Sequence, residues 1–236
     1  RARFAPAGLA LHDNERAVAG YLQGIWDNGV ATPAQKTLAN TFARLATVDA
    51  AGYEAALSGF VGRMPVVQAA AAPLAAQSFL FNMASCATFA DAGVALRERP
   101  CVWNRVIGGE SRVDAGDPAG YVRRFVSWQG GGQVALAGDW FVGGGIAYSD
   151  DRFTDLQPNE SASGHGFLAG VSVKRQSGPW VLSATLAGGN AWADATRTFA
   201  LPGVAGSSPL TYTANASNRT AYVDGKLRAT YAIALD

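Results

Sequence analysis

The segment that begins at Arg219 alternates small or apolar residues with polar or charged ones as far as Ile233. One side carries Ala221, Val223, Gly225, Leu227, Ala229, Tyr231 and Ile233, and the other carries Tyr222, Asp224, Lys226, Arg228 and Thr230. Strands of soluble sheets are typically only about 5–6 residues long. A tilted strand that crosses a bilayer needs about 9–11 residues, with its apolar side toward lipid. The pattern therefore predicts a membrane-spanning β-strand.

Five similar segments precede this strand. They are Cys101–Asp114, Tyr121–Ala137, Trp140–Phe153, His165–Gln176 and Trp180–Asp194. Short turns are expected at Gly138-Asp139 and Ser177–Pro179, and long polar loops at Asp150–Ser163 and Thr196–Asn218. Short turns on one side and long loops on the other are typical of outer-membrane barrels. The sequence therefore predicts an antiparallel up-and-down β-barrel, in preference to a soluble β-sandwich.

Residues 1–100 show a helical period instead. A first helix is expected to be capped by Asp13 or Asn14 and to end at Asn28-Gly29. Further helices are expected to begin at Thr32-Pro33, Asp49 and Pro73, the third ending near Gly62 and the fourth running toward Cys86. A short helix or loop is expected over Phe89–Arg97. This part of the chain is Ala-rich, and it offers no catalytic polar cluster.

Composition narrows the class of protein. Charged residues make up 16% of the 236 residues, below the usual quarter, and the net charge is only +1. Neither half forms a basic surface for nucleic acid, so no nucleic-acid partner is expected. Low charge together with 28 glycines suits membrane strands, and it also suits secreted repeat proteins.

The two cysteines, Cys86 and Cys101, are fifteen positions apart. Beside outer-membrane strands the compartment is oxidising, which favours a disulfide between them. Closing a loop of this size contributes roughly 3 kcal/mol in the chain-entropy model. The alternative is a pair of buried free thiols.

The sequence offers no catalytic, cofactor or metal site. His12 and His165 lack further ligands at metal spacing, and no serine sits in a nucleophile elbow. The glycine runs Gly130–Gly132 and Gly143–Gly145 are not followed by a helix or a P-loop lysine, so close strand packing is the better interpretation. We therefore expect a protein that is not an enzyme.

Four segments, in this order, carry a family resemblance: PLAAQSFLFNMASC, RPCVWNRVIGGESR, GYVRRFVSWQGGGQVALAGDWFVGGGIAYSDDRF and PWVLSATLAGGNAWADATR, the last ending in Arg197. They resemble the translocator domain of autotransporters, the type V secretion proteins of Gram-negative bacteria. The resemblance covers essentially the whole chain. It implies a twelve-stranded barrel with an α-helix threaded through its lumen, which carries an N-terminal passenger to the cell surface.

On this resemblance, residues 1–100 are the helical junction between passenger and barrel, and residues 101–236 are the first half of the barrel, about six of twelve strands. The start shows no signal peptide and the end interrupts a strand pattern, so we expect a piece of a longer gene product. The luminal helix is expected within Leu74–Ala87 or Phe89–Arg97. The disulfide would tie that helix to the first strand.

The polar strand faces would then line a hydrated lumen, where they either hold the helix and ease passage of the passenger or are merely solvated. The candidates are Arg123, Gln129, Gln133, Lys174, Asp224, Lys226 and Arg228. The candidate membrane-interface aromatics are Trp128, Trp140, Tyr148, Trp180 and Tyr231. A register shift of one residue would exchange the two faces.

The expected location is the outer membrane of a Gram-negative bacterium, with the helical lead in the periplasm, in the lumen or at the cell surface. The expected partners are outer-membrane lipid, the chain's own passenger and the barrel-assembly machinery. The alternative function is a barrel without transport activity that serves as a surface adhesin or structural protein.

Overall fold

The computed structural model describes residues 4, 8–28, 41–42, 44–46, 48–62, 64–84, 86, 88–90, 95–114, 120–156, 159–201, 208 and 210–231. The chain divides into two compact units. The first comprises Arg1–Arg63 with Thr196–Asn215, and the second comprises Met64–Ala195 with Ala216–Asp236. Most of the helix expected after Thr32-Pro33 lies outside the described residues.

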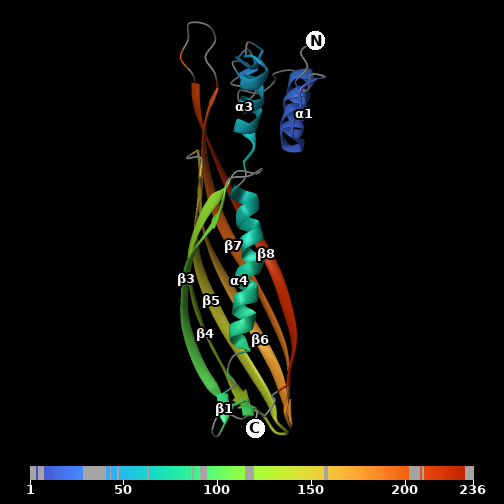
Figure 1. The fold of residues 1–236 in the computed structure, drawn as a ribbon, viewed down its shortest axis with the longest axis vertical. Coiled ribbons are helices and arrows are strands. Elements are labelled where there is room, and N and C mark those ends of the chain that lie inside the picture. The colour runs from blue at the N-terminus through green and yellow to red at the C-terminus, as the bar shows by residue number, and fades with distance from the viewer. Residues whose placement is uncertain are drawn as a thin grey trace. The chain divides into compact units, whose positions relative to one another are not determined.

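Six long strands form one sheet. They are β3 (Cys101–Val113), β4 (Tyr121–Ala135), β5 (Trp140–Asp155), β6 (Glu160–Ser177), β7 (Trp180–Leu201) and β8 (Leu210–Tyr231). Each strand lies beside the next in sequence, in the order β3-β4-β5-β6-β7-β8, and the sheet is not closed (Figure 1). The antiparallel up-and-down architecture predicted from the sequence is confirmed, as an open part of a barrel.

The strands are longer than their apolar alternation suggested. β5 runs to Asp155, β6 begins at Glu160, β7 runs to Leu201 and β8 begins at Leu210. The long loops expected at Asp150–Ser163 and Thr196–Asn218 are therefore wrong. Backbone pairing does not require an apolar outer face. In these extensions the outer face is polar, for example at Asp150, Arg152 and Thr196, so the apolar alternation ends before the strand does.

In the second unit, the helix α4 (Met64–Met83) runs along one face of the sheet, here called the inner face (Figure 1). Burial alternates along the strands. In β6, for example, Leu168, Ser172 and Lys174 are buried, whereas Phe167 and Val173 are exposed. Because side chains alternate between faces, the exposed set marks the opposite, outer face. No described helix is long and apolar enough to cross a membrane.

The helix α4 begins earlier than expected. It starts at Met64, and Pro73 lies inside it rather than at its start. Pro65 sits in the first turn, where a missing N–H does no harm. The Met64 N–H donates to Glu160 Oε1 of β6 at 3.0 Å, which satisfies one of the unpaired amides of the helix start.

A short helix or loop was expected over Phe89–Arg97, and the described residues of this segment form strands instead. Thr88–Ala90 (β1) and Ala95–Arg97 (β2) pair as antiparallel strands. The phenylalanine at position 89 pairs with Leu96. This segment is therefore excluded as a second candidate for the helix on the inner face.

The first unit contains α1 (Asp13–Asn28) and α3 (Ala50–Phe60). Asp49 caps α3 as expected, because its carboxylate accepts the Gly52 N–H at 2.8 Å. The helix α1 already begins at Asp13, so neither Asp13 nor Asn14 precedes it as a cap. Instead, Glu15 Oε2 accepts the His12 N–H at 2.9 Å.

An apolar core holds the first unit together. Leu22, Ile25 and Leu57 are buried in it, among other residues. The Tyr53 hydroxyl donates to the Phe4 carbonyl oxygen at 2.6 Å, and burial raises the pKa of Tyr53 above its usual value. A buried tyrosine with a satisfied hydroxyl adds apolar area without an unpaired polar group.

Candidate functional site

Apolar contacts fix one side of α4 against the inner face. Phe79 and Leu80 are fully buried there, with Ala147, Leu168 and Ala187 of the strands. Glycines on the strands make room for the helix. A Cβ at Gly145 would lie 3.3 Å from the Phe79 ring, and a Cβ at Gly170 would lie 2.9 Å from Met83 Sδ. The glycine runs therefore serve close packing of the helix as well as of neighbouring strands.

Polar contacts fix the C-terminal turns of α4. Asn82 Nδ2 donates to Gln129 Oε1 at 2.6 Å, and Asn82 Oδ1 accepts from Arg105 Nη1 at 2.7 Å. The Phe81 ring faces two cations of β8, with Lys226 Nζ 5.0 Å and Arg228 Cζ 5.7 Å from its centroid. Asn82 thus uses both ends of its amide on the sheet, which specifies the position of the helix as well as stabilising it.

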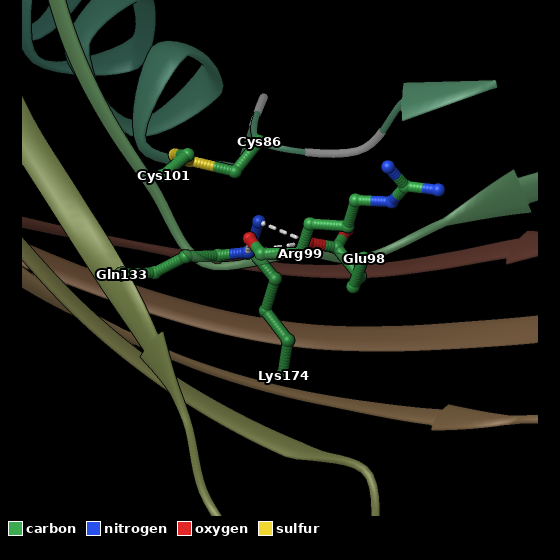
Figure 2. The surroundings of a disulfide bond; sticks show 6 residues. All are labelled: Cys86, Glu98, Arg99, Cys101, Gln133 and Lys174. Atoms are coloured by element: carbon green, nitrogen blue, oxygen red, sulfur yellow. Dashed lines mark hydrogen bonds and ion pairs between the residues drawn. A yellow bond between two sulfur atoms is a disulfide. The ribbon is translucent and has the colours of Figure 1, made fainter. Parts of the chain in front are cut away.

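A buried ion pair lies at the end of the inner face near Cys101 (Figure 2). Lys174 Nζ lies 3.0 Å from Glu98 Oε2, and the two side chains are 1% and 2% exposed. Gln133 Nε2 donates to the same carboxylate oxygen at 2.8 Å and to the Arg99 carbonyl oxygen at 2.7 Å. The Glu98 N–H donates to Gln176 Oε1 at 2.9 Å. Buried charges need such partners, because desolvation otherwise costs several kcal/mol per ion.

The predicted disulfide is present. Cys86, which follows α4, is bonded to Cys101, the first residue of β3 (Figure 2). The bond and the Glu98–Lys174 pair lie close together in the figure, and both restrain the segment between α4 and the sheet. The end of α4 is therefore held by the disulfide that follows it and by the amide contacts of Asn82, while the ion pair fixes Glu98, just before β3, to β6.

We expect removal of the disulfide to lower stability measurably. Replacing Cys86 and Cys101 with serine should cost about 3 kcal/mol of unfolding free energy, because a bridge over fifteen residues restricts the unfolded chain. Denaturant unfolding with and without reductant measures this. Reductant should weaken the wild type by the same amount and leave the double variant unchanged. Reactive thiols at both positions in the untreated protein would contradict the prediction.

The structure places all seven predicted polar residues on the inner face, in different groups. Gln129, Lys226 and Arg228 contact α4, whereas Gln133 and Lys174 contact Glu98. The other two have different partners. Arg123 Nη2 lies 2.6 Å from Asp151 Oδ1, and its guanidinium lies 4.7 Å above the Phe125 ring. Asp224 accepts the N–H of its neighbour Gly225.

The outer face carries the predicted aromatic residues. Trp128, Trp140, Tyr148, Trp180 and Tyr231 are all 40–52% exposed there. Trp128 and Tyr148 are directly paired across β4 and β5, and Tyr148 is paired with Phe167 of β6. At the other end of the strands, the Trp180 and Tyr231 rings lie 4.8 Å apart. Two groups of aromatics thus border the stretch of outer face between them.

Sequence reasoning missed several residues of this site, among them Arg105, Glu160, Asn82, Asp151 and Glu98. Asn82 is the single amide in the otherwise apolar run FLFNM, and that contrast was a usable signal. Asp151 shares its face with Ser149 and Phe153, so alternation could also have placed it. Glu98 lies outside both regular patterns, just before Pro100, and no periodicity points to it. Among the described residues, no three side chains gather as metal ligands.

An open up-and-down sheet with an apolar, aromatic-bordered outer face and a helix on its inner face defines a membrane β-barrel type of protein. Comparison with family models is consistent with this class: the model of the autotransporter β-domain matches residues 102–236, more than half of the chain. The chain therefore belongs to the autotransporter β-domain family, which is a translocator family of the bacterial outer membrane. Among curated proteins, the sequence finds no match.

Proposed function

We propose that the chain inserts into the outer membrane as part of a β-barrel and there exports and anchors an N-terminal passenger. The observation that carries this proposal is the position of α4. It lies along the inner face, held at its start by Glu160 and near its end by Gln129 and Arg105. On this proposal, the segment that precedes α4 follows a defined path through the barrel. A plain adhesin barrel would have no need of this helix.

The outer face supports insertion in a bilayer. Along β5 it presents Trp140, Val142, Ile146 and Tyr148 before it becomes charged at Asp150 and Arg152. Trp140 and Tyr148 are eight residues apart, on the order of 26 Å along a strand. With a tilt of about 40°, this length spans roughly 20 Å along the membrane normal, which is most of an apolar band of about 25 Å bordered by aromatic girdles. On this proposal the five exposed aromatics lie at the two membrane interfaces.

Each part of the chain has a separate role in this function. Residues 101–236 belong to the barrel and residues 1–100 to the junction with the passenger, with α4 in the lumen. The seven polar residues of the inner face line that lumen, and three of them, Gln129, Lys226 and Arg228, hold α4. The short turns at Gly138-Asp139 and Gly178-Pro179 face the periplasm, as short turns of such barrels do. Insertion would depend on the barrel-assembly machinery.

Surface display tests the proposal directly. In the full-length protein, produced in a Gram-negative host, an epitope placed before residue 1 should reach the surface of intact cells. Added protease should remove it there, while a periplasmic marker stays protected. An epitope that remains protected, although the barrel has folded and resists heat and detergent, would refute export. It would favour the adhesin or structural alternative.

Neutralising the cations beside Phe81 should change ion flow through the completed barrel. Lys226→Gln with Arg228→Gln removes two positive charges from the inner face and two cation–π contacts with α4, each worth about 0.5–2 kcal/mol. We expect greater cation selectivity and larger conductance in planar bilayers. The matched control is Arg124→Gln on the outer face, which should leave both unchanged. Unaltered conductance in the double variant would mean that these residues are only solvated.

A further inference from the structure

The β7–β8 hairpin continues beyond the apolar part of the outer face. As far as Trp192 on β7 and Arg219 on β8, the outer face includes exposed apolar residues such as Leu182, Leu186 and Val223. Beyond that level the same face is polar. Asp194 Oδ1 accepts from Ser217 Oγ at 2.6 Å, and Thr196 Oγ1 donates to Asn215 Oδ1 at 3.0 Å. A face of exposed hydroxyls, amides and carboxylates does not suit lipid, so this part of the hairpin lies in water.

The opposite face of the same hairpin end carries aromatic side chains, and these are covered by the helices of the first unit. Phe199 stacks on Tyr212 across the hairpin, with ring centroids 5.6 Å apart, and on Phe60 of α3 at 4.8 Å. The strand approaches α3 at Gly59, where an added Cβ would lie 3.5 Å from Phe199 Cβ, an ordinary van der Waals contact. Phe199 and Tyr212 both pack against the buried core of the first unit. The hairpin end is thus one wall of the core that the helices form.

A charged side chain of the hairpin, Arg197, contacts the C-terminal end of α3. Arg197 Nη2 donates to the Ser58 carbonyl oxygen at 2.8 Å, in the last turn of α3. The Ser58 carbonyl oxygen also accepts the Val61 N–H at 3.1 Å. Because the carbonyl oxygens of a last helical turn carry partial negative charge, a guanidinium is a suitable second partner. From the helical side, Arg44 Nη1 donates to the carbonyl oxygen of Ser208, between β7 and β8, at 3.3 Å. The Arg197 contact discriminates a helix end from an arbitrary apolar segment.

We propose that the end of the β7–β8 hairpin, around Arg197, Phe199 and Tyr212, is a docking site on the cell surface for α3 of the same chain. This rests on the proposed function, in which α3 leaves the barrel ahead of α4. The helix α3 ends at Phe60 and α4 begins at Met64, so docking holds the chain directly next to the luminal helix. Burial of Phe60 and Phe199 outside the membrane opposes return of the exported segment into the pore.

Engineered cysteines give a sharp test. A Cβ–Cβ distance of 3.5 Å lies within the range of disulfides, so Gly59→Cys with Phe199→Cys should bridge spontaneously on intact cells. The matched control is Gly59→Cys with Thr198→Cys, because position 198 is exposed on the opposite face of β7. Mass spectrometry of proteolytic peptides identifies the bridge, and it distinguishes this bridge from the native Cys86–Cys101 bond. We expect at least tenfold more of the 59–199 bridge than of the 59–198 bridge.

A second pair of variants keeps the inference testable without a crosslink. Arg197→Gln with Phe199→Ala should speed cleavage of residues 1–60 by added protease on intact cells about tenfold or more, whereas Thr198→Ala should not. A 59–198 bridge as abundant as the 59–199 bridge, or equal cleavage rates, would overturn the docking site. Loss of surface display in the wild type would instead refute the proposed function, so the two failures are distinguishable.

Discussion

Replacing Lys174 with methionine should destabilise the sheet and its helix by about 3–5 kcal/mol, because Glu98 would keep a negative charge in a site that is 2% exposed. Gln133 and the Gln176 amide would remain as partners of the Glu98 residue, but neither supplies a positive charge. Unfolding in denaturant, or the temperature at which the folded band is lost in detergent gels, measures the effect. Few single substitutions in this chain should cost more.

A double-mutant cycle separates the pair from its surroundings. Adding Glu98→Gln to Lys174→Met removes the stranded charge, so the double variant should recover a large part of the loss. Arg124→Met provides a matched control. Arg124 pairs with Glu110 at 2.6 Å on the outer face, with side chains 71% and 52% exposed, and exposed pairs contribute only about 0–1 kcal/mol. A Lys174→Met loss no larger than that of Arg124→Met would refute the role of the buried pair.

The strand faces were predictable from sequence because side chains alternate strictly along a strand. Leu227 and Val223 are 85% and 76% exposed, whereas Lys226 and Asp224 on the other parity are partly buried. Once the apolar face is known, every residue of a regular strand has its face assigned. This is why the seven polar candidates share one face of the strands and the five aromatics the other; their roles at a lumen and at membrane interfaces stay predictions.

Strand ends and partners were not predictable in the same way. Outside the apolar band, residues such as Thr196 and Asn215 face water on one side, and their sequence looks like a loop. Proline is frequent in the first turn of a helix, so a helix start was expected at Pro73. The helix α4 nevertheless contains Pro73 in its interior, because long-range contacts at Met64 and Asn82 hold both ends of the helix. Glu98, the partner of Lys174, lies in a segment with neither helical nor strand periodicity. Only the structure therefore identifies it as the partner.

Replacing Phe79 with alanine should release α4 from the inner face. Its side chain is 0% exposed and packs where Gly145 leaves room, so truncation should cost about 3–5 kcal/mol, including the cavity that remains. The helix is joined to the sheet in other places, so we expect it to loosen while the strands stay paired. In the full-length protein, planar-bilayer recordings should then show larger and more variable conductance. The unfolding temperature should fall.

Leu74→Ala is the matched control, since Leu74 belongs to the same helix and is 58% exposed. It removes a large apolar side chain without opening a cavity, so conductance should stay at the wild-type level. If Phe79→Ala and Leu74→Ala behaved alike, packing of the Phe79 face would not be what retains the helix. Retention would then rest on the polar contacts of Asn82 and on the Cys86–Cys101 bond, and combining Asn82→Leu with reductant should open the pore instead.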